Sequence, residues 1–149
     1  MPNGNAPLSE KRIKKYLNMA KNVSEMSTFY KQHHLGAIFT YKNRVLSDGW
    51  NSLKSSPIQK EYNKYRDFAF DSPNNGTLHA EMMALVRCRD MDVDWSKVSV
   101  FVYREHADGH PALARCCPAC MKALKDKGIK NIYYSTEFSP DGFTYERIG

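Results

Sequence analysis

In the first fifty residues the spacing of apolar positions changes from helical to strand-like. Apolar residues recur at three- and four-residue intervals over 13–23 and follow Ser9, a favoured N-cap residue. We therefore expect a helix from Ser9 into the low twenties. The apolar run 35–41 and the segment 44–51, joined by a Lys-Asn turn, predict a β-hairpin.

A long connection from Ser52 to Gly76 separates this hairpin from a second helical region. Within it the Ser56-Pro57 pair has the N-cap and N1 pattern, and apolar positions from Ile58 to Ala69 share one helical face. The segment 77–91 then predicts a major helix that begins near Thr77.

Strands and a helix alternate in the second half of the chain. Residues 98–105 are β-branched, aromatic and nearly all apolar, as in a strand that is covered on both faces. Residues 116–128 predict a helix that begins at the cysteines and ends at Gly128, a favoured C′ residue. Residues 129–136 predict another strand.

This alternation predicts an α/β sandwich with parallel pairing in the core of its sheet. The short strand pattern at 143–148 follows Thr136 too closely for the crossover that a parallel return strand needs. We expect this last strand to be antiparallel to its neighbour.

The 149 residues are the length of one domain, so we expect a single domain over 1–149, with 1–7 flexible. The formal net charge is +6, and the whole excess lies in residues 1–71, which carry 12 Lys and Arg against 6 Asp and Glu. Solvated helix faces account for such an excess, and so does a partner that carries phosphate. Charge leaves both interpretations open.

The expected location of the protein and the clustering of its cysteines limit the kinds of site that the cysteines can form. No apolar run is long enough to cross a bilayer and the N-terminus has no secretory pattern, so we expect a cytoplasmic protein without a membrane partner. Thiols stay reduced in that compartment, and clustered cysteines there indicate metal binding or catalysis. Three of the four cysteines lie in one short stretch, Cys116–Cys120.

Two predicted helix starts carry residues that bind metals. The first has His79 and Glu81, and the second has Cys117 and Cys120 in a Cys-x-x-Cys pattern. A helix N-terminus favours thiolate, the form that binds metal. One His and two Cys supply three ligands, which fits a catalytic zinc whose fourth position is left to water.

The two motifs together resemble the zinc-dependent cytidine, deoxycytidylate and tRNA-adenosine deaminases, whose signature is H-x-E followed by P-C-x-x-C. The resemblance extends from the first helix to Thr136. It implies a three-layer α/β/α sandwich around a mixed five-stranded sheet, one Zn²⁺ per chain and a homo-oligomer. It also implies that His79, Cys117 and Cys120 bind the zinc and that Glu81 shuttles protons.

Two further residues enter through the same resemblance. Asn51, at the end of the hairpin, and Ala80, between the two residues of the first motif, match positions that contact substrate. Where the family has proline before its first cysteine, this chain has Cys116. Pro118 directly after Cys117 matches helix-start geometry, so we expect Cys117 and Cys120 to be the ligands and Cys116 a buried bystander.

The substrate is less constrained. With its short chain and antiparallel last strand, the protein resembles the branch of the family that acts on small free pyrimidines, which implies a cytosine nucleoside or nucleotide. The basic first half favours a phosphate-bearing form such as dCMP. The alternatives are RNA or single-stranded DNA, with the basic and aromatic residues of 60–68 as contacts, or another base such as guanine. A non-catalytic zinc module is a further alternative, which the intact Glu81 disfavours. Arg115 is a speculative phosphate contact, and His106 and His110 are expected to be solvated.

Overall fold

Antiparallel and parallel pairings combine in one mixed sheet at the centre of the molecule. The computed structural model describes residues 7–27, 33–55, 57–62, 77–106, 108–139 and 142–149. The elements in chain order are α1 (Glu10–Ser24), β1 (His34–Tyr41), β2 (Arg44–Trp50), β3 (Ser52–Ser55), α2 (Pro57–Tyr62), β4 (Thr77–Leu78), α3 (Ala80–Cys88), a 3₁₀ turn (Trp95–Lys97), β5 (Ser99–Glu105), β6 (Pro111–Ala112), α4 (Pro118–Lys127), β7 (Asn131–Ser135) and β8 (Phe143–Arg147).

The strands of the main sheet follow the order β2-β1-β5-β7-β8, and the short β6 pairs with β5 beside this path. β5 and β7 are parallel, and α4 connects them. The other pairings are antiparallel, including that of β8 with β7. The predicted parallel core and antiparallel last strand are therefore confirmed. The connection from β5 to β7 is long enough for the α4 crossover, whereas the connection from β7 to β8 is not.

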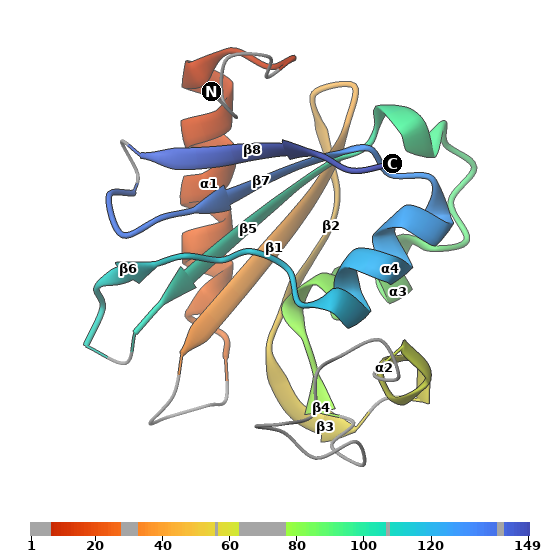
Figure 1. The fold of residues 1–149 in the computed structure, drawn as a ribbon, viewed down its shortest axis with the longest axis horizontal. Helices are drawn as coiled ribbons and strands as arrows, with labels where there is room; N and C mark the ends of the chain where they lie inside the picture. Colours follow the sequence, from red (N-terminus) through yellow and green to blue (C-terminus); the bar gives the residue numbers. More distant parts are fainter. Residues whose placement is uncertain (1–6, 28–32, 56, 63–76, 107, 140–141) are drawn as a thin grey trace.

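Helices cover both faces of the sheet, as the three-layer prediction requires. Figure 1 shows α1 crossing behind the strands, with α3 and α4 on the opposite side. Successive strand residues alternate between the two sides: Ile38 and Phe101 pack with α1, while Phe39 and Val100 pack in the core that includes α3 and α4. This period of two is what a sheet buried on both faces requires.

Local sequence signals account for several boundaries. The Ser9 side chain accepts a hydrogen bond from the Arg12 backbone N–H at 3.3 Å, so Ser9 caps α1 as predicted. Lys42 and Asn43 both have positive φ, 49° and 64°, which matches the turn of a two-residue hairpin. Gly128 ends α4 with φ of 100°, a left-handed conformation in which a side chain would be strained.

The predicted start of the second major helix was wrong by three residues. Thr77 and Leu78 form β4, which pairs with β3, and α3 begins only at Ala80. The strands β3, β4 and β6 were not predicted, because strands of two to four residues are too short to have a periodic pattern. Pro57 opens α2 as predicted, but the expected continuation of this helix to Ala69 falls in the segment 63–76, which lies outside the described residues. Most of the N-terminal stretch that we expect to be flexible also lies outside them.

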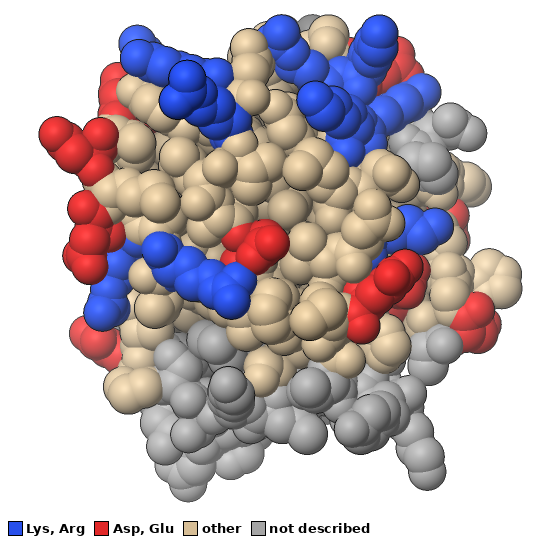
Figure 2. Space-filling model, turned by 180° about the vertical axis from the view of Figure 1, so that it is seen from behind, with Lys and Arg blue, Asp and Glu red and all other residues tan. Residues whose placement is uncertain are grey.

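Basic side chains are unevenly distributed over the surface. Figure 2 shows the face opposite to that of Figure 1, where Lys and Arg gather towards the end at which α1 begins and β1 turns into β2. β3 and β4 lie at the other end of the molecule. None of the helices in the described part of the chain combines the length and hydropathy needed to cross a bilayer.

Candidate metal and catalytic centre

His79 is placed by the short sheet that the sequence did not predict. β4 pairs with β3 through Leu78 and Ser52, so the chain arrives at α3 beside the end of β2. His79 has extended backbone, with φ of −80° and ψ of 155°, and is the N-cap of α3. Its side chain makes no capping hydrogen bond, which leaves the imidazole available to face the neighbouring helix.

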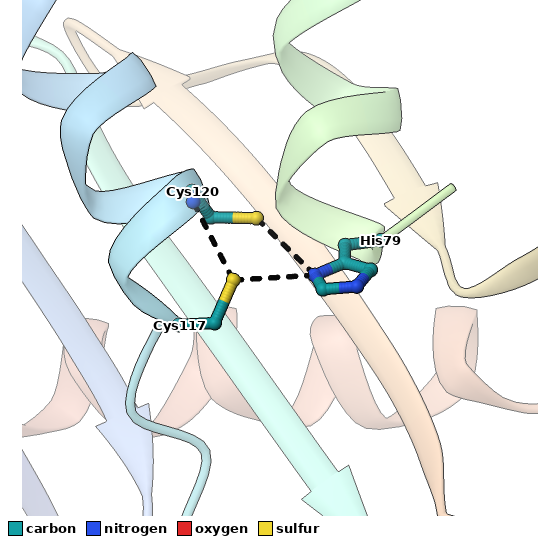
Figure 3. A group of neighbouring side chains, drawn as sticks. All are labelled: His79, Cys117 and Cys120. Atoms are coloured by element: carbon teal, nitrogen blue, oxygen red, sulfur yellow. Dashed lines mark hydrogen bonds between the residues drawn. The ribbon is translucent and has the colours of Figure 1, made fainter. Parts of the chain in front are cut away.

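Cys117 has the same position at the start of α4. It is the N-cap residue, and its sulfur accepts a hydrogen bond from the Cys120 backbone N–H at 3.5 Å. Pro118 follows at N1, where a missing N–H costs nothing and the fixed φ suits a helix. This local geometry directs both cysteine sulfurs towards the start of α3, as Figure 3 shows.

The three side chains converge on one point. The Nδ1 of His79 lies 3.4 Å from the sulfur of Cys117 and 3.5 Å from that of Cys120. The three possible ligand atoms all lie within 4.8 Å of one another, the only such cluster among the described residues. Around a tetrahedral zinc, with Zn–S of about 2.3 Å and Zn–N of about 2.05 Å, nitrogen and sulfur ligands lie roughly 3.6 Å apart. The cluster therefore fits one Zn²⁺ with three protein ligands.

Charge on the two thiols also suits a cation. The hydrogen bond shared with Cys120, together with the neighbouring His79, lowers the pKa of Cys117. The same shared proton, together with burial, raises the pKa of Cys120 well above its ordinary value. Cys117 and Cys120 together therefore carry one negative charge readily. Deprotonation of the second thiol needs a compensating cation, as when a metal binds to a dithiol.

Glu81 lies in the first turn of α3, two residues from His79. It is buried, with 3% of its surface exposed, and its Oε1 atom has no hydrogen-bond partner among the described residues. Burial, and secondly the negative charge of Cys117, raise the pKa of this carboxyl group. A buried carboxylate with a free acceptor atom beside a metal cluster is suited to receive and release a proton.

The two other cysteines lie outside the cluster. Cys116 is buried next to Cys117, and burial, followed by the charge of Glu81, raises its pKa well above the ordinary value. Cys88, the last residue of α3, directs its thiol to the carbonyl of Ala84 within the same helix. The geometry groups Cys117 and Cys120, the pair that the position of Pro118 favoured.

The two expected substrate contacts, Asn51 and Ala80, differ in the atoms that they can offer to a ligand. The Asn51 side chain accepts from the Leu35 backbone N–H and donates to the His33 carbonyl, each at 2.9 Å, so it fastens the end of β2 to the start of β1. The methyl group of Ala80 is completely buried, which leaves only backbone atoms to face a ligand.

Three residues that the sequence singled out near the cysteine motif have surroundings that the fold alone reveals. Arg115, a speculative phosphate contact, makes two hydrogen bonds of 3.1 Å to the carboxylate of Glu146. His106 and His110 are exposed, as expected, but they line a groove with His33 and Arg104, two residues that the sequence did not single out. Neither of these two belongs to a motif, so only the fold could bring them together.

Comparisons with known proteins agree with this geometry. A family model, the cytidine and deoxycytidylate deaminase zinc-binding region, matches residues 10–136. No curated protein sequence matches the chain.

Solved structures are similar in fold. The dCMP deaminase from the cyanophage S-TIM5 is 23% identical, with 85% of this chain and 84% of that chain covered and a TM-score of 0.58. The same enzyme in complex with dCMP and dUMP gives 22% identity, coverage of 85% and 82% and a TM-score of 0.56. The cytidine deaminase from Burkholderia pseudomallei is 14% identical, with 89% and 90% covered and a TM-score of 0.58.

Proposed function

Since the chain belongs to the cytidine and deoxycytidylate deaminase family, we propose that it removes the amino group of a cytosine nucleoside or nucleotide by hydrolysis. Members of this family are zinc-dependent hydrolases that act on a C–N bond, and the triad of His79, Cys117 and Cys120 is the site for one zinc ion. The products would be the uracil compound and ammonia.

The observation that carries this proposal is the place of Glu81. It is the buried acid of the first turn of the helix that His79 caps, and one of its oxygens has no partner among the described residues. Bound zinc supplies Lewis acidity, which lowers the pKa of a water molecule to about 7. A purely structural zinc site does not need a buried carboxyl group with a raised pKa next to it.

Glu81 would move protons in two directions. It takes a proton from the attacking water and gives it to ring nitrogen N3, which makes the neighbouring carbon C4 more electrophilic. The water oxygen bonds to C4, the bond from C4 to the amino nitrogen breaks, and Glu81 delivers the second proton to the departing ammonia. The raised pKa of Glu81 supports this role because the carboxyl group must hold a proton part of the time.

Asn51 and Ala80, which the family resemblance singles out, would bind and orient the base. Asn51 lies at the end of β2, and its amide is held by two backbone groups, one in β1 and one just before it. Both amide atoms retain bonding capacity, one lone pair and one N–H, for a sugar or base. Ala80 can contribute only through its backbone, because its methyl group faces the core.

A small cytosine substrate is favoured over a polynucleotide by the last strand. β8 is antiparallel to β7, the arrangement that resembles the branch acting on free pyrimidines.

The family resemblance also leads us to expect a homo-oligomer, which light scattering of the purified protein would test.

A substrate panel tests the proposal. The zinc-loaded protein is offered cytosine, cytidine, deoxycytidine, CMP, dCMP, adenosine, guanine and oligonucleotides, and ammonia release is compared with that of Glu81→Ala. We expect release from a cytosine nucleoside or nucleotide that depends on Glu81. Release from oligonucleotides alone, or from guanine alone, would overturn the proposed substrate class.

A further inference from the structure

A groove of about 830 Å³ opens between the start of β1 and the loops after β5 and β7. We call it the histidine groove, after His33, His106 and His110, which line it together with Arg104. Glu137 is the acid among its lining residues, and its side chain is exposed. Among its described lining residues, the groove therefore combines one permanent cation with three imidazoles.

Arg104 makes no ion pair with a carboxylate of the described residues. Its Nε atom is buried and has no hydrogen-bond partner in the described ranges, and burial lowers the pKa of its guanidinium. Two other arginines have carboxylate partners: Arg115 is paired with Glu146, and Arg87 with Asp48. A half-buried guanidinium without an anion is unfavourable, so a bound anion would relieve that cost.

Two imidazoles stand beside Arg104. The rings of His33 and His106 lie with their centroids 4.7 Å apart, and the buried Nδ1 of His33 also lacks a hydrogen-bond partner in the described part of the chain. Burial, then the charges of Arg104 and His106, lower the pKa of His33. The positive charges of these groups disfavour protonation of the imidazoles. An anion bound to all of them would favour it instead. His110 differs, because Asp108 already accepts from it at 3.0 Å.

Backbone pairings connect the groove with the elements that lead to the catalytic centre. Arg104 pairs with Leu35 of β1 and with Ala112 of β6, five residues before Cys117. The Asn51 amide holds both Leu35 and His33. The charge of Glu81 also acts on Arg104, which places the cation within electrostatic range of the proposed proton shuttle. An anion in the groove and a base at the metal centre could therefore belong to one molecule.

We propose that the histidine groove binds the 5′-phosphate of the substrate, with Arg104 as its main contact and with His33 and His106 as further donors. The inference rests on the proposed function and narrows it from a cytosine nucleoside or nucleotide to the nucleotide. Arginine suits this ligand because its planar fork bonds two phosphate oxygens at once.

Substrate preference tests the inference. The values of kcat/KM for dCMP and deoxycytidine are measured for the wild type and for Arg104→Gln, both loaded with zinc. We expect the wild type to prefer dCMP and Arg104→Gln to lower that preference by roughly 10- to 100-fold, mainly through KM for dCMP. His106→Gln, on an exposed loop where folding is not at risk, should lower it by roughly 3- to 10-fold.

Arg44→Gln is the matched control. It removes the same charge from the exposed turn at the opposite end of β1, as its pairing with Tyr41 places it. Its preference for dCMP should equal that of the wild type. An equal loss for both substrates in Arg104→Gln, a wild type indifferent to the phosphate, or a preference for oligonucleotides over dCMP would each overturn the inference.

A binding measurement separates this inference from the proposed function. Inorganic phosphate and dUMP are titrated into the zinc-loaded protein and followed by ³¹P NMR and by the imidazole signals of His33 and His106. Binding that weakens in Arg104→Gln supports the phosphate site even if no cytosine compound is deaminated. Binding that is unaffected by Arg104→Gln and His106→Gln contradicts it, whatever the enzyme deaminates.

Discussion

The sulfur of Cys120 lies 3.5 Å from Nδ1 of His79, although 41 residues separate them in the chain. Each residue belongs to the first turn of a helix or caps it, and the two helices, α3 and α4, cover the same face of the sheet. Two helix N-termini thus meet at one point. Their partial positive charges favour thiolate and carboxylate there, and their unwound starts let side chains converge that a regular helix would separate.

Removing one zinc ligand should remove the metal. We expect Cys117→Ala to contain far less zinc than the wild type, since two remaining ligands hold the ion poorly. Cys116→Ala should retain about one zinc per chain, because its thiol is not part of the cluster. The zinc content of the purified proteins measures this. A Cys116→Ala protein without zinc, beside a Cys117→Ala protein with it, would reverse the assignment.

Removing the proposed proton shuttle should leave the metal in place. Glu81→Gln keeps the size of the side chain but cannot accept a proton, so we expect turnover to fall by roughly 10²- to 10⁴-fold while zinc content stays near that of the wild type. Steady-state kinetics and zinc content, measured on the same sample, give both values. Full turnover in Glu81→Gln would exclude Glu81 from the chemistry.

Two glycines test how closely the helices must approach the sheet. A Cβ at Gly49 would meet the Ala84 backbone nitrogen of α3 at 2.6 Å, and one at Gly36 would meet the Ser24 backbone nitrogen of α1 at 2.6 Å. Backbone cannot move aside as a flexible side chain can, so alanine at either position should lower the free energy of unfolding by about 1–3 kcal/mol or more. Denaturant unfolding would measure this loss.

The two substitutions should differ at the metal centre. α3 carries Glu81 and is capped by His79, whereas α1 carries no residue of the cluster. Gly49→Ala should therefore weaken zinc binding in a competition with a chelator, and Gly36→Ala should leave it near the wild-type value. Equal zinc affinities in the two variants would show that the position of α3 does not control the site.

The Arg115–Glu146 pair gives a pH dependence with a definite sign. The hydrogen bond from Arg115 lowers the pKa of Glu146 below its ordinary 4.5 in the folded protein. Its stabilising contribution is therefore present above pH 4.5 and is lost as the pH falls through the lower, folded-state pKa. Because both side chains are partly exposed, we expect Glu146→Gln to reduce the free energy of unfolding at pH 7 by less than about 1 kcal/mol.

Unfolding of Glu146→Gln and the wild type, in the same metal state, checks this between pH 7 and pH 3. The difference should shrink on acidification and also in 1 M salt, which screens exposed pairs. A difference that grows as the pH falls would contradict the assigned direction of the pKa shift.

Local signals in the sequence determined most of the elements. Ser9 caps α1, the Lys42-Asn43 turn closes the hairpin, and Gly128 ends α4, because each depends on the backbone within a few residues. The metal residues were also within reach of sequence, since the motifs of His79 and Cys117 each open a helix. The connection too short for a crossover fixed the direction of β8.

Tertiary structure alone decided what surrounds those residues. α3 begins at Ala80 and not at the predicted Thr77, because Thr77 and Leu78 pair with a strand that is distant in sequence. Arg115 donates to Glu146 on β8. Arg104 and His33 line one groove, although they are distant in sequence and belong to no motif. Such contacts depend on strand order and register, which bring together residues that no local spacing connects.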